Sequence, residues 1–178
     1  LEEATSGYAA AKLSGVLACK AYNNEYFNGK CRFIPIIPNT VYGPNDHFDL
    51  EYSHVFSALI GRFFRANKTG TKKVILWGSG NPKREFIFNE DIADAAIFLV
   101  DNSESIENNH YNVGTSVETS IKDLALMISR ALNYKGEIVW DKSKPDGRPS
   151  KLIDSSRIRN LGWSHNININ EGLDLTLE

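Results

Sequence analysis

Apolar residues along the chain recur with helical spacing in some stretches and form short unbroken runs in others. The helical spacing predicts helices over residues 8–27, 53–67, 90–102, 120–133, 154–163 and 169–178, with Ser53 and Ser120 as N-caps. The unbroken runs predict strands over residues 32–37, 72–77, 84–88, 110–114 and 136–141. Because the first run is continuous, we expect that strand to be buried on both faces of a parallel sheet. Helices that alternate with strands in this way are typical of an α/β fold.

The alternation of helices and strands starts at the N-terminus with a helix that no strand precedes. The chain starts with Leu1 rather than methionine, and no strand precedes the acidic stretch "LEEATSG". Neither a G-x-G-x-x-G nor a G-x-x-G-x-x-G motif is present in the sequence, so it offers no glycine-rich turn to hold phosphates at a helix N-terminus. We therefore expect the chain to be a portion of a longer α/β protein.

Composition and charge exclude several classes of protein. With 42% hydrophobic and 24% charged residues over 178 positions, the chain has the composition of a globular protein with a domain-sized core. Its formal net charge of -2 creates no basic field that would attract nucleic acid or anionic lipid. No apolar run approaches the roughly 20 residues that cross a bilayer. We expect neither a nucleic acid nor a membrane as a partner.

The cysteines and three of the histidines are predicted to be structural. Cys19 and Cys31 lack the spacing of metal ligands and are too few for a disulfide framework. We expect them to serve in packing, in a reducing cytoplasm, and we expect no bound metal. The histidines expected to be structural or to face the solvent are His47, His110 and His165.

The stretch "GYAAAKLSG" places Tyr8 four residues before Lys12 in the first predicted helix. At about 100° per residue, Tyr8, Lys12, Gly15 and Cys19 share one narrow stripe of that helix. An ammonium beside a tyrosine hydroxyl favours the phenolate, which suits a group that exchanges a proton with a sugar or alcohol oxygen. The alternative is an ordinary surface pair, which on the spacing alone is the commoner case.

The residues that follow supply the context for this pair. The motif Y-A-x-A-K-x-x-G precedes a strand that ends in P-x-x-x-Y-G-P, and this order resembles the extended short-chain dehydrogenases/reductases that act on nucleotide sugars. Within that family, "SHVFSALIGRF", "WGSGNPKREF", "YNVGTSVETSI" and "KPDGRPSKLID" are similar to the GDP-L-fucose synthases. The resemblance extends in order over essentially the whole chain.

The resemblance implies a particular organisation of the chain. It implies the C-terminal portion of a Rossmann-type doubly wound sheet together with a smaller α/β substrate-binding domain, with the N-terminal dinucleotide-binding half absent. Residues 1–45 would be the last part of the NADP-binding domain, and residues 86–115 a return to it. Residues 46–85 and 116–178 would form the two parts of the substrate-binding domain.

The resemblance also implies catalytic and cofactor-binding roles. Tyr8 would be the catalytic acid, and Lys12 would assist it and hold the nicotinamide ribose. His54 would be the acid of an epimerisation whose base is a cysteine upstream of this chain. The segment that lines the nicotinamide of NADP(H) and the sugar would be Pro38, Asn39, Thr40 and Val41.

Five matching residues would contact a GDP-sugar substrate: His54, Arg62, Trp77, Arg84 and Asp146. Arginine has the fork that a diphosphate needs, and a tryptophan can stack on guanine. From the residues alone, His54 could instead be a capping residue and the arginines solvated charges. Trp77 could equally belong to the core, and Asp146 could serve only in a turn.

The resemblance implies an NADP-dependent epimerase/reductase that converts GDP-4-keto-6-deoxymannose to GDP-L-fucose. It also implies a homodimer that forms through the helix of Tyr8 and Lys12. We expect the 178 residues alone to be inactive, because they lack the dinucleotide cradle. Two alternatives stay open: a nucleotide-sugar 4-epimerase or dehydratase of the same family, and a non-catalytic protein that binds sugar nucleotides.

Five positions depart from the pattern of the GDP-L-fucose synthases. Asn39 and Thr40 stand in the reverse of the usual order, and His47 replaces an asparagine. Ser57 replaces a proline and Ser150 an arginine. Since some of these positions touch the sugar-facing region, a related GDP-sugar such as a 6-deoxy-heptose remains an alternative substrate.

Overall fold

The computed structural model describes residues 6–49 and 52–178. Predictions that fall on residues 1–5 and 50–51, namely the acidic start and part of the polar loop, lie outside the described residues. The helices are α1 (Ser6–Phe27), α2 (Val55–Thr69), α3 (Asn89–Asp101), α4 (Ile121–Ala131), α5 (Ser156–Asn160) and α6 (Ile169–Leu177). The strands are β1 (Ile36–Pro38), β2 (Thr40–Tyr42), β3 (Lys73–Trp77), β4 (Lys83–Phe88), β5 (Tyr111–Val113), β6 (Glu118–Ser120) and β7 (Glu137–Asp141).

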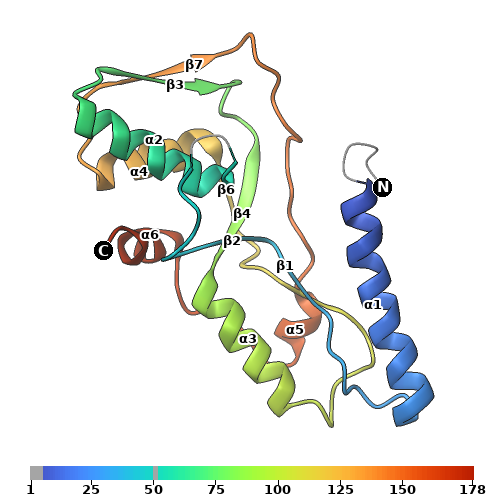
Figure 1. Cartoon of the computed structure of the whole chain (residues 1–178). Helices are drawn as coiled ribbons and strands as arrows, with labels where there is room; N and C mark the ends of the chain where they lie inside the picture. Colours follow the sequence, from blue (N-terminus) through green and yellow to red (C-terminus); the bar gives the residue numbers. More distant parts are fainter. Residues whose placement is uncertain (1–5, 50–51) are drawn as a thin grey trace.

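The strands pair mainly in parallel, and the α/β prediction is confirmed. β1 pairs with β5, β2 with β4, and β3 with β7, all in parallel, while β6 runs antiparallel to β4. In Figure 1, β3 and β7 lie with α2 and α4 at one end of the molecule, and α3 and α5 lie at the other. The long strand β4 connects the two ends.

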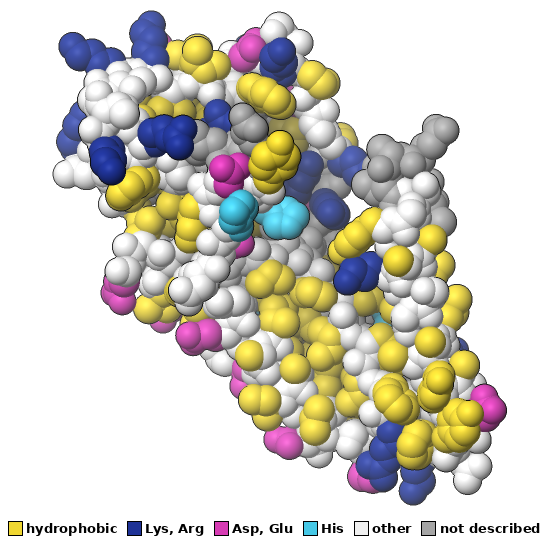
Figure 2. Space-filling view, viewed as in Figure 1, with side chains coloured by type: hydrophobic (Ala, Val, Ile, Leu, Met, Phe, Trp, Pro, Cys, Tyr) yellow, Lys and Arg dark blue, Asp and Glu magenta, His cyan; other side chains and the backbone are white. Residues whose placement is uncertain are grey.

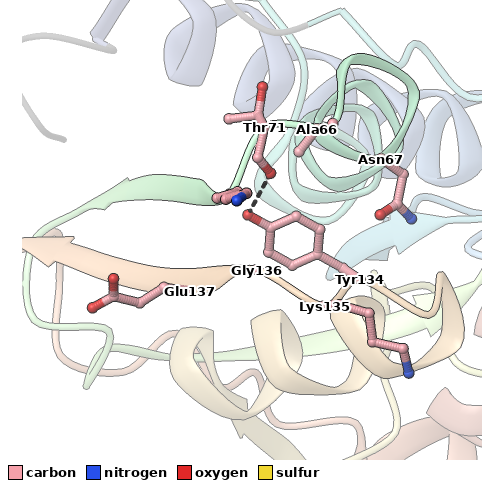
Figure 3. Close-up of a pocket in the computed structure, with 9 residues that line it drawn as sticks. Ala66, Asn67, Thr71, Tyr134, Lys135, Gly136 and Glu137 are labelled. Atoms are coloured by element: carbon pink, nitrogen blue, oxygen red, sulfur yellow. Dashed lines mark hydrogen bonds between the residues drawn. The ribbon is translucent and has the colours of Figure 1, made fainter.

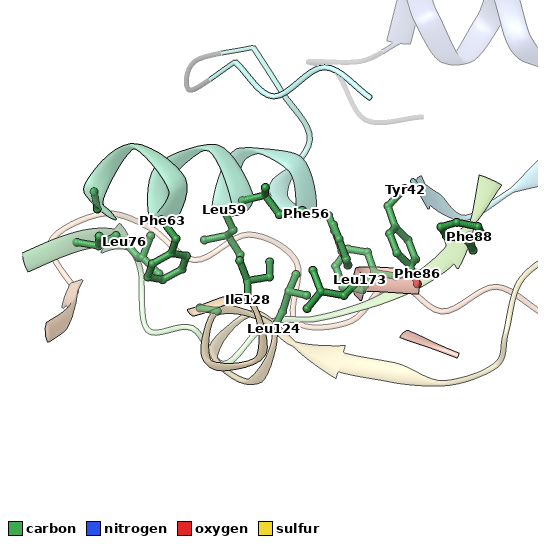
Figure 4. Packing of buried hydrophobic residues seen from close by; sticks show 14 residues of the cluster. Tyr42, Phe56, Leu59, Phe63, Leu76, Phe86, Phe88, Leu124, Ile128 and Leu173 are labelled. Carbon is green, nitrogen blue, oxygen red and sulfur yellow. The ribbon is translucent and has the colours of Figure 1, made fainter. Parts of the chain in front are cut away.

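Two hydrophobic clusters stabilise these ends. The larger one packs α2, α4 and α6 against β3 and β4, with the rings of Tyr42 and Phe56 stacked at 4.0 Å between centroids (Figure 4). The second cluster joins α3 and β5, and it includes Ile158 and Trp163 from the C-terminal part of the chain. The division at residues 45, 85 and 115 stays a prediction.

Helix α1 touches the rest of the chain mainly near its C-terminal end. Asn28 and Gly29 end it with φ angles of 52° and 80°, in the left-handed region that commonly follows the last turn of a helix. Asn23 is its one buried residue, and its side chain accepts from the amides of Arg32 and Phe33, each at 2.9 Å. Because these amides are bound to Asn23, they cannot join a sheet ladder.

The strand predicted over residues 32–37 is therefore wrong in its bounds. β1 begins only at Ile36, after Pro35, which has no amide hydrogen to donate. The expected burial on both faces is also wrong, since Ile37 and Pro38 are exposed and β1 pairs with β5 alone among the described strands. The short strands β2 and β6 were not predicted.

The two predicted N-caps have different outcomes. Ser120 caps α4 by accepting from the Asp123 amide at 3.0 Å, as predicted. Ser53 does not cap α2, because the first helical hydrogen bond, from the Ala58 amide, is accepted by the carbonyl of His54 at 2.9 Å. His54 is thus the N-cap residue, and α2 begins at Val55.

Residues 142–155, which we call the strap, cross from β7 at one end of the molecule to α5 at the other without regular secondary structure (Figure 1). Several hydrogen bonds fix this segment. The carbonyl of Pro149 accepts from the Lys83 amide at 2.8 Å, and the carbonyl of Asp154 accepts from Asn112 at 2.9 Å. The strap therefore contacts both ends of the molecule.

None of the helices in the described part of the chain combines the length and the hydropathy that crossing a bilayer requires.

Candidate functional site

Tyr8 and Lys12 both lie on the exposed N-terminal half of α1. The Tyr8 side chain is 71% exposed, and the ammonium of Lys12 lies 5.5 Å from the centre of its ring. Tyr8 and Asn23 are separated by only about 60° around the helix axis. Since Asn23 packs against the rest of the chain, the side of α1 that carries Tyr8 and Lys12 faces the same way.

The space-filling view shows what this side of α1 faces. In Figure 2, α1 stands apart from the body of the molecule, and the surface between them is hollowed. Hydrophobic side chains form the floor of the hollow, and Lys and Arg side chains gather towards its upper end. An exposed pair beside such a hollow is accessible to a ligand.

The segment from Pro38 to Val41 lies where α/β sheets commonly bind ligands. Pro38 is the last residue of β1 and pairs with Val113, the last residue of β5, so the segment follows the carboxyl ends of two parallel strands. The Asn39 amide nitrogen of the backbone donates to the carbonyl of Val113 at 3.1 Å. Thr40 and Val41 continue directly into β2.

Both polar atoms of the Asn39 side chain form hydrogen bonds. Its Nδ2 donates to the carboxylate of Glu85 and, at 3.0 Å, to the carbonyl of Lys151 in the strap. Its Oδ1 accepts from the Thr40 amide at 2.9 Å. Asn39, one of the two residues in reversed order, thus joins the predicted cofactor segment to the strap.

Trp77, Arg84 and Asp146 converge around the beginning of the strap. Trp77 ends β3 with its side chain 69% exposed, so it is not a core residue, and the ammonium of Lys144 lies 5.7 Å from its ring centre. Two residues further on, Ser79 donates to Asp146 from its amide at 2.7 Å and from its hydroxyl at 2.6 Å. These hydrogen bonds hold the pKa of the Asp146 carboxyl below its ordinary value.

Arg84 is held at the same place. Its Nη1 donates to the carbonyl of Arg148 at 2.8 Å and to that of Lys83 at 2.6 Å. Gly147 leaves it room, since a Cβ there would lie 3.0 Å from Nη2 of Arg84. The exposed indole, the guanidinium and the lysine ammonium form a surface suited to a base and a diphosphate.

The other two predicted substrate residues lie on α2. His54 is exposed at the start of the helix. Arg62 lines a separate hollow of about 340 Å³ with Val74 and Ile75, and Ile75 lies on the same exposed face of β3 as Trp77. Arg62 therefore lies beside the strand that carries Trp77, in a hollow that Trp77 does not line.

Two of the departing residues make bonds of their own. Ser57, where the related synthases have proline, is buried and donates from its hydroxyl to the carboxylate of Asp46. Ser150 donates to Glu118 at 2.5 Å. The first bond holds the loop of Asp46 against α2, and the second holds the strap against β6.

Glu85, the residue next to Arg84 in β4, was not predicted from the sequence. Its side chain is 0% exposed, and it accepts hydrogen bonds from Asn39, Ser116 and Ile153. The available signal was a carboxylate directly before the apolar residues Phe86 and Ile87, in a strand expected to be buried.

The histidines and cysteines that were predicted to be structural differ in their burial. Burial, together with Arg157 and Lys20, lowers the pKa of His110, and burial raises the pKa of the Cys31 thiol. Cys19 and Cys31 are free thiols. His47 is exposed, and His165 lines a small cavity of about 100 Å³.

A further hollow lies at the far end of α2 and contains none of the predicted residues. It has a volume of about 380 Å³, and Tyr134 borders it with its hydroxyl donating to the carbonyl of Thr71 at 3.1 Å (Figure 3). This hollow is therefore not part of the candidate site.

The parallel strand pairs and the helices packed against them define an α/β protein. The NAD dependent epimerase/dehydratase family matches residues 2–114, and the chain belongs to this family.

Known relatives agree with this assignment. The chain is 43% identical over 178 residues to a putative GDP-L-fucose synthase 2 of Arabidopsis thaliana, covering 100% of this chain and 53% of that protein. The structure superposes on an NADP-bound GDP-L-fucose synthetase of Naegleria fowleri with a TM-score of 0.89 at 26% identity, over 99% of this chain and 56% of that one. It superposes on a GDP-6-OMe-4-keto-L-xylo-heptose reductase of C. jejuni with a TM-score of 0.84 at 31% identity, over 99% and 61%. The chain thus spans about half the length of the curated relatives it matches.

Proposed function

We propose that these residues belong to an NADP-dependent epimerase/reductase that converts GDP-4-keto-6-deoxymannose to GDP-L-fucose. The observation that carries the proposal is the convergence of Trp77, Arg84 and Asp146 at the beginning of the strap. An exposed indole can stack on guanine, and a guanidinium can bind a diphosphate, so one surface offers both halves of GDP a partner. The names of the relatives support a GDP-sugar as the substrate.

In the proposed reaction, His54 and Tyr8 transfer different protons. A 4-keto sugar is acidic at C3 and C5. A base, for which the resemblance implies a cysteine upstream of these residues, removes those protons, and the exposed imidazole of His54 returns protons on the opposite face. The hydroxyl of Tyr8 protonates the oxygen at C4 when that carbon is reduced, and the charge of Lys12 favours this transfer.

The residues proposed to hold NADP(H) are Lys12 and the segment Pro38, Asn39, Thr40 and Val41. Two observations support the fit: Lys12 is exposed beside Tyr8, and Pro38 is exposed at the carboxyl end of a parallel strand. The ammonium of Lys12 is a donor for ribose hydroxyls. When bound, NADPH supplies the hydride for C4.

Calorimetry with the 178-residue chain tests the substrate half of the proposal. We expect GDP to bind and UDP to bind at least about tenfold more weakly, because stacking and edge contacts favour guanine. The variant Trp77→Ala should lose most of the GDP affinity, whereas Trp140→Phe should retain it as a control. Equal binding of GDP and UDP would overturn the proposed substrate class.

A GDP-heptose is the second candidate substrate. It is favoured by the similarity to the C. jejuni reductase and by Ser57 and His47, which depart from the fucose synthase pattern near the sugar. Turnover of the two 4-keto sugars by an active enzyme that contains these residues separates the candidates. A 4-epimerase or dehydratase would need no His54, and a non-catalytic protein would bind GDP-sugars without turnover.

We also propose that the active protein is a homodimer in the cytoplasm. Leu13 and Leu17 are about half exposed on α1 and offer a second copy an apolar surface, and two free thiols suit a reducing compartment. Sedimentation of wild type and of Leu17→Glu should show a dimer and a monomer, respectively.

A further inference from the structure

Glu85 is a buried carboxylate that the proposed reaction does not use. It lies in β4 between Arg84 and Phe86, and its side chain has no exposed surface. An ionised carboxylate accepts hydrogen bonds and donates none, and burying it is costly unless it is well supplied with donors. The donors it has gathered therefore indicate what it does.

The donors come from three separate segments. Asn39 donates from Nδ2 at the junction of β1 and β2, Ser116 donates its amide at 2.6 Å after β5, and Ile153 donates its amide at 3.3 Å near the end of the strap. Gly114 packs against the same carboxylate so closely that a Cβ there would lie 2.3 Å from Oε1. One side chain thus connects β4 with the predicted cofactor segment, the β5 loop and the strap.

The contacts along the strap follow a definite order. Arg84 binds the carbonyl of residue 148, Asn39 binds the carbonyl of residue 151, and Glu85 binds the amide of residue 153. Two neighbouring residues of β4 therefore hold the strap at both ends of the stretch 148–153, with Asn39 between them. Asp146 and its bond to Ser79 lie just before this stretch.

We propose that Glu85 is a positioning residue, which holds the strap so that Arg84 and Asp146 keep the arrangement that binds a nucleoside diphosphate. The consequence for binding rests on the proposed function. Through Asn39, the same carboxylate fixes the distance between the 38–41 segment and the strap.

The isosteric variant Glu85→Gln tests this role in the 178-residue chain. Glutamine has one acceptor oxygen where Glu85 has two, so it can accept from Asn39 and Ile153 or from Ser116, but not from all three. It also lacks the charge that strengthens these hydrogen bonds. We expect hydrogen exchange to become about tenfold faster at the amides of Ile153 and Ser79, with little change in α4. We expect the GDP affinity to fall by a similar factor.

Two further variants make the test specific. Asn39→Ala removes the central contact and should give the same local pattern if Glu85→Gln fails to fold. Glu118→Gln changes a carboxylate that holds the strap at Ser150 and Lys151 but does not bond to Asn39. We expect it to leave Ser79 exchange and GDP affinity within about twofold of wild type.

Three outcomes would overturn the inference: unchanged exchange at Ile153 and Ser79, equally increased exchange throughout α4, or a loosened strap with unchanged GDP affinity. If the wild-type chain bound no GDP, the proposed function would fail, and the exchange pattern would still decide whether Glu85 positions the strap.

Discussion

The ammonium of Lys12 lies over the ring of Tyr8, 5.5 Å from its centre. This contact is a cation–π interaction between residues one helical turn apart, on the side of α1 that faces the body of the molecule. Lys12 therefore does not depend on a ligand to lie near Tyr8, and its charge is available beside the ring that carries the hydroxyl of the proposed reaction.

Replacing Tyr8 by phenylalanine should separate the two halves of the reaction. In an active enzyme that contains these residues, we expect Tyr8→Phe to lower the rate of ketone reduction by about 10²–10⁴-fold, because the group that protonates the C4 oxygen is lost. Exchange of the C3 and C5 protons with solvent deuterium, followed by NMR, should continue. Tyr22→Phe, on the same helix, should change neither rate, and near-normal reduction by Tyr8→Phe would refute the assignment.

His54→Asn should give the opposite pattern. We expect the exchange at C3 and C5 to fall by about 10²–10⁴-fold, because the acid that returns those protons is lost. Reduction of a sugar that already has the product configuration at both carbons should be little affected, and its rate is measured by the absorbance of NADPH. Full activity of His54→Asn would favour a 4-epimerase or dehydratase.

The candidate site could be predicted only in part, for reasons that particular residues illustrate. Tyr8, Trp77 and Arg84 have side-chain chemistry that a motif reveals. The bonds between Ser79 and Asp146, and between Asn39, Glu85 and Ile153, join residues distant in sequence, so no local pattern encodes them.

In the fold, too, features that depend on neighbouring residues could be predicted, and features that depend on distant contacts could not. The caps and stops that depend on neighbouring residues, such as Ser120 with Asp123 or the turn at Asn28, were predictable. The start of β1 was not, because Asn23 on α1 takes up the amides of Arg32 and Phe33. Strands of three residues such as β2 and β6 are also too short to show a period.

Asp146→Ala should weaken GDP binding although it removes a negative charge. The charge alone would favour the anionic ligand, but the loss of both bonds from Ser79 frees the turn after Trp77. We expect the second effect to prevail and the affinity to fall by about tenfold in calorimetry. Asp141→Ala is the matched control, since Asp141 bonds to Ser143 within its own turn. If both variants bound GDP more tightly, Asp146 would act only through its charge.

The stability of the chain should depend on His110 below neutral pH. Burial, Arg157 and Lys20 lower its pKa in the folded state from 6.5, so the unfolded chain binds a proton more readily. The contribution of His110 to the free energy of unfolding is therefore complete above about pH 6.5. It is lost as the pH drops from there to the pKa of His110 in the folded state. We expect His110→Gln to flatten the melting temperature between pH 7 and 5 relative to wild type, and His47→Gln, at an exposed site, to leave the slope unchanged. An equal slope in His110→Gln would assign the effect to other groups.

Asn23→Ala should release α1 from the rest of the chain. The substitution removes the hydrogen bonds of Asn23 to the amides of Arg32 and Phe33 and to the side chain of Asn108, and each lost bond costs about 0.5–1.5 kcal/mol. We expect faster proteolysis around residues 28–33 and the loss of hydrogen-exchange protection in that loop, with the α2–α4 cluster intact. Asn24→Ala removes only one bond from Asn108 at the helix surface and should have a small effect. Because α1 carries Tyr8 and Lys12, Asn23→Ala should also slow reduction in an active enzyme, and unchanged reduction with a released loop would show that α1 is held elsewhere.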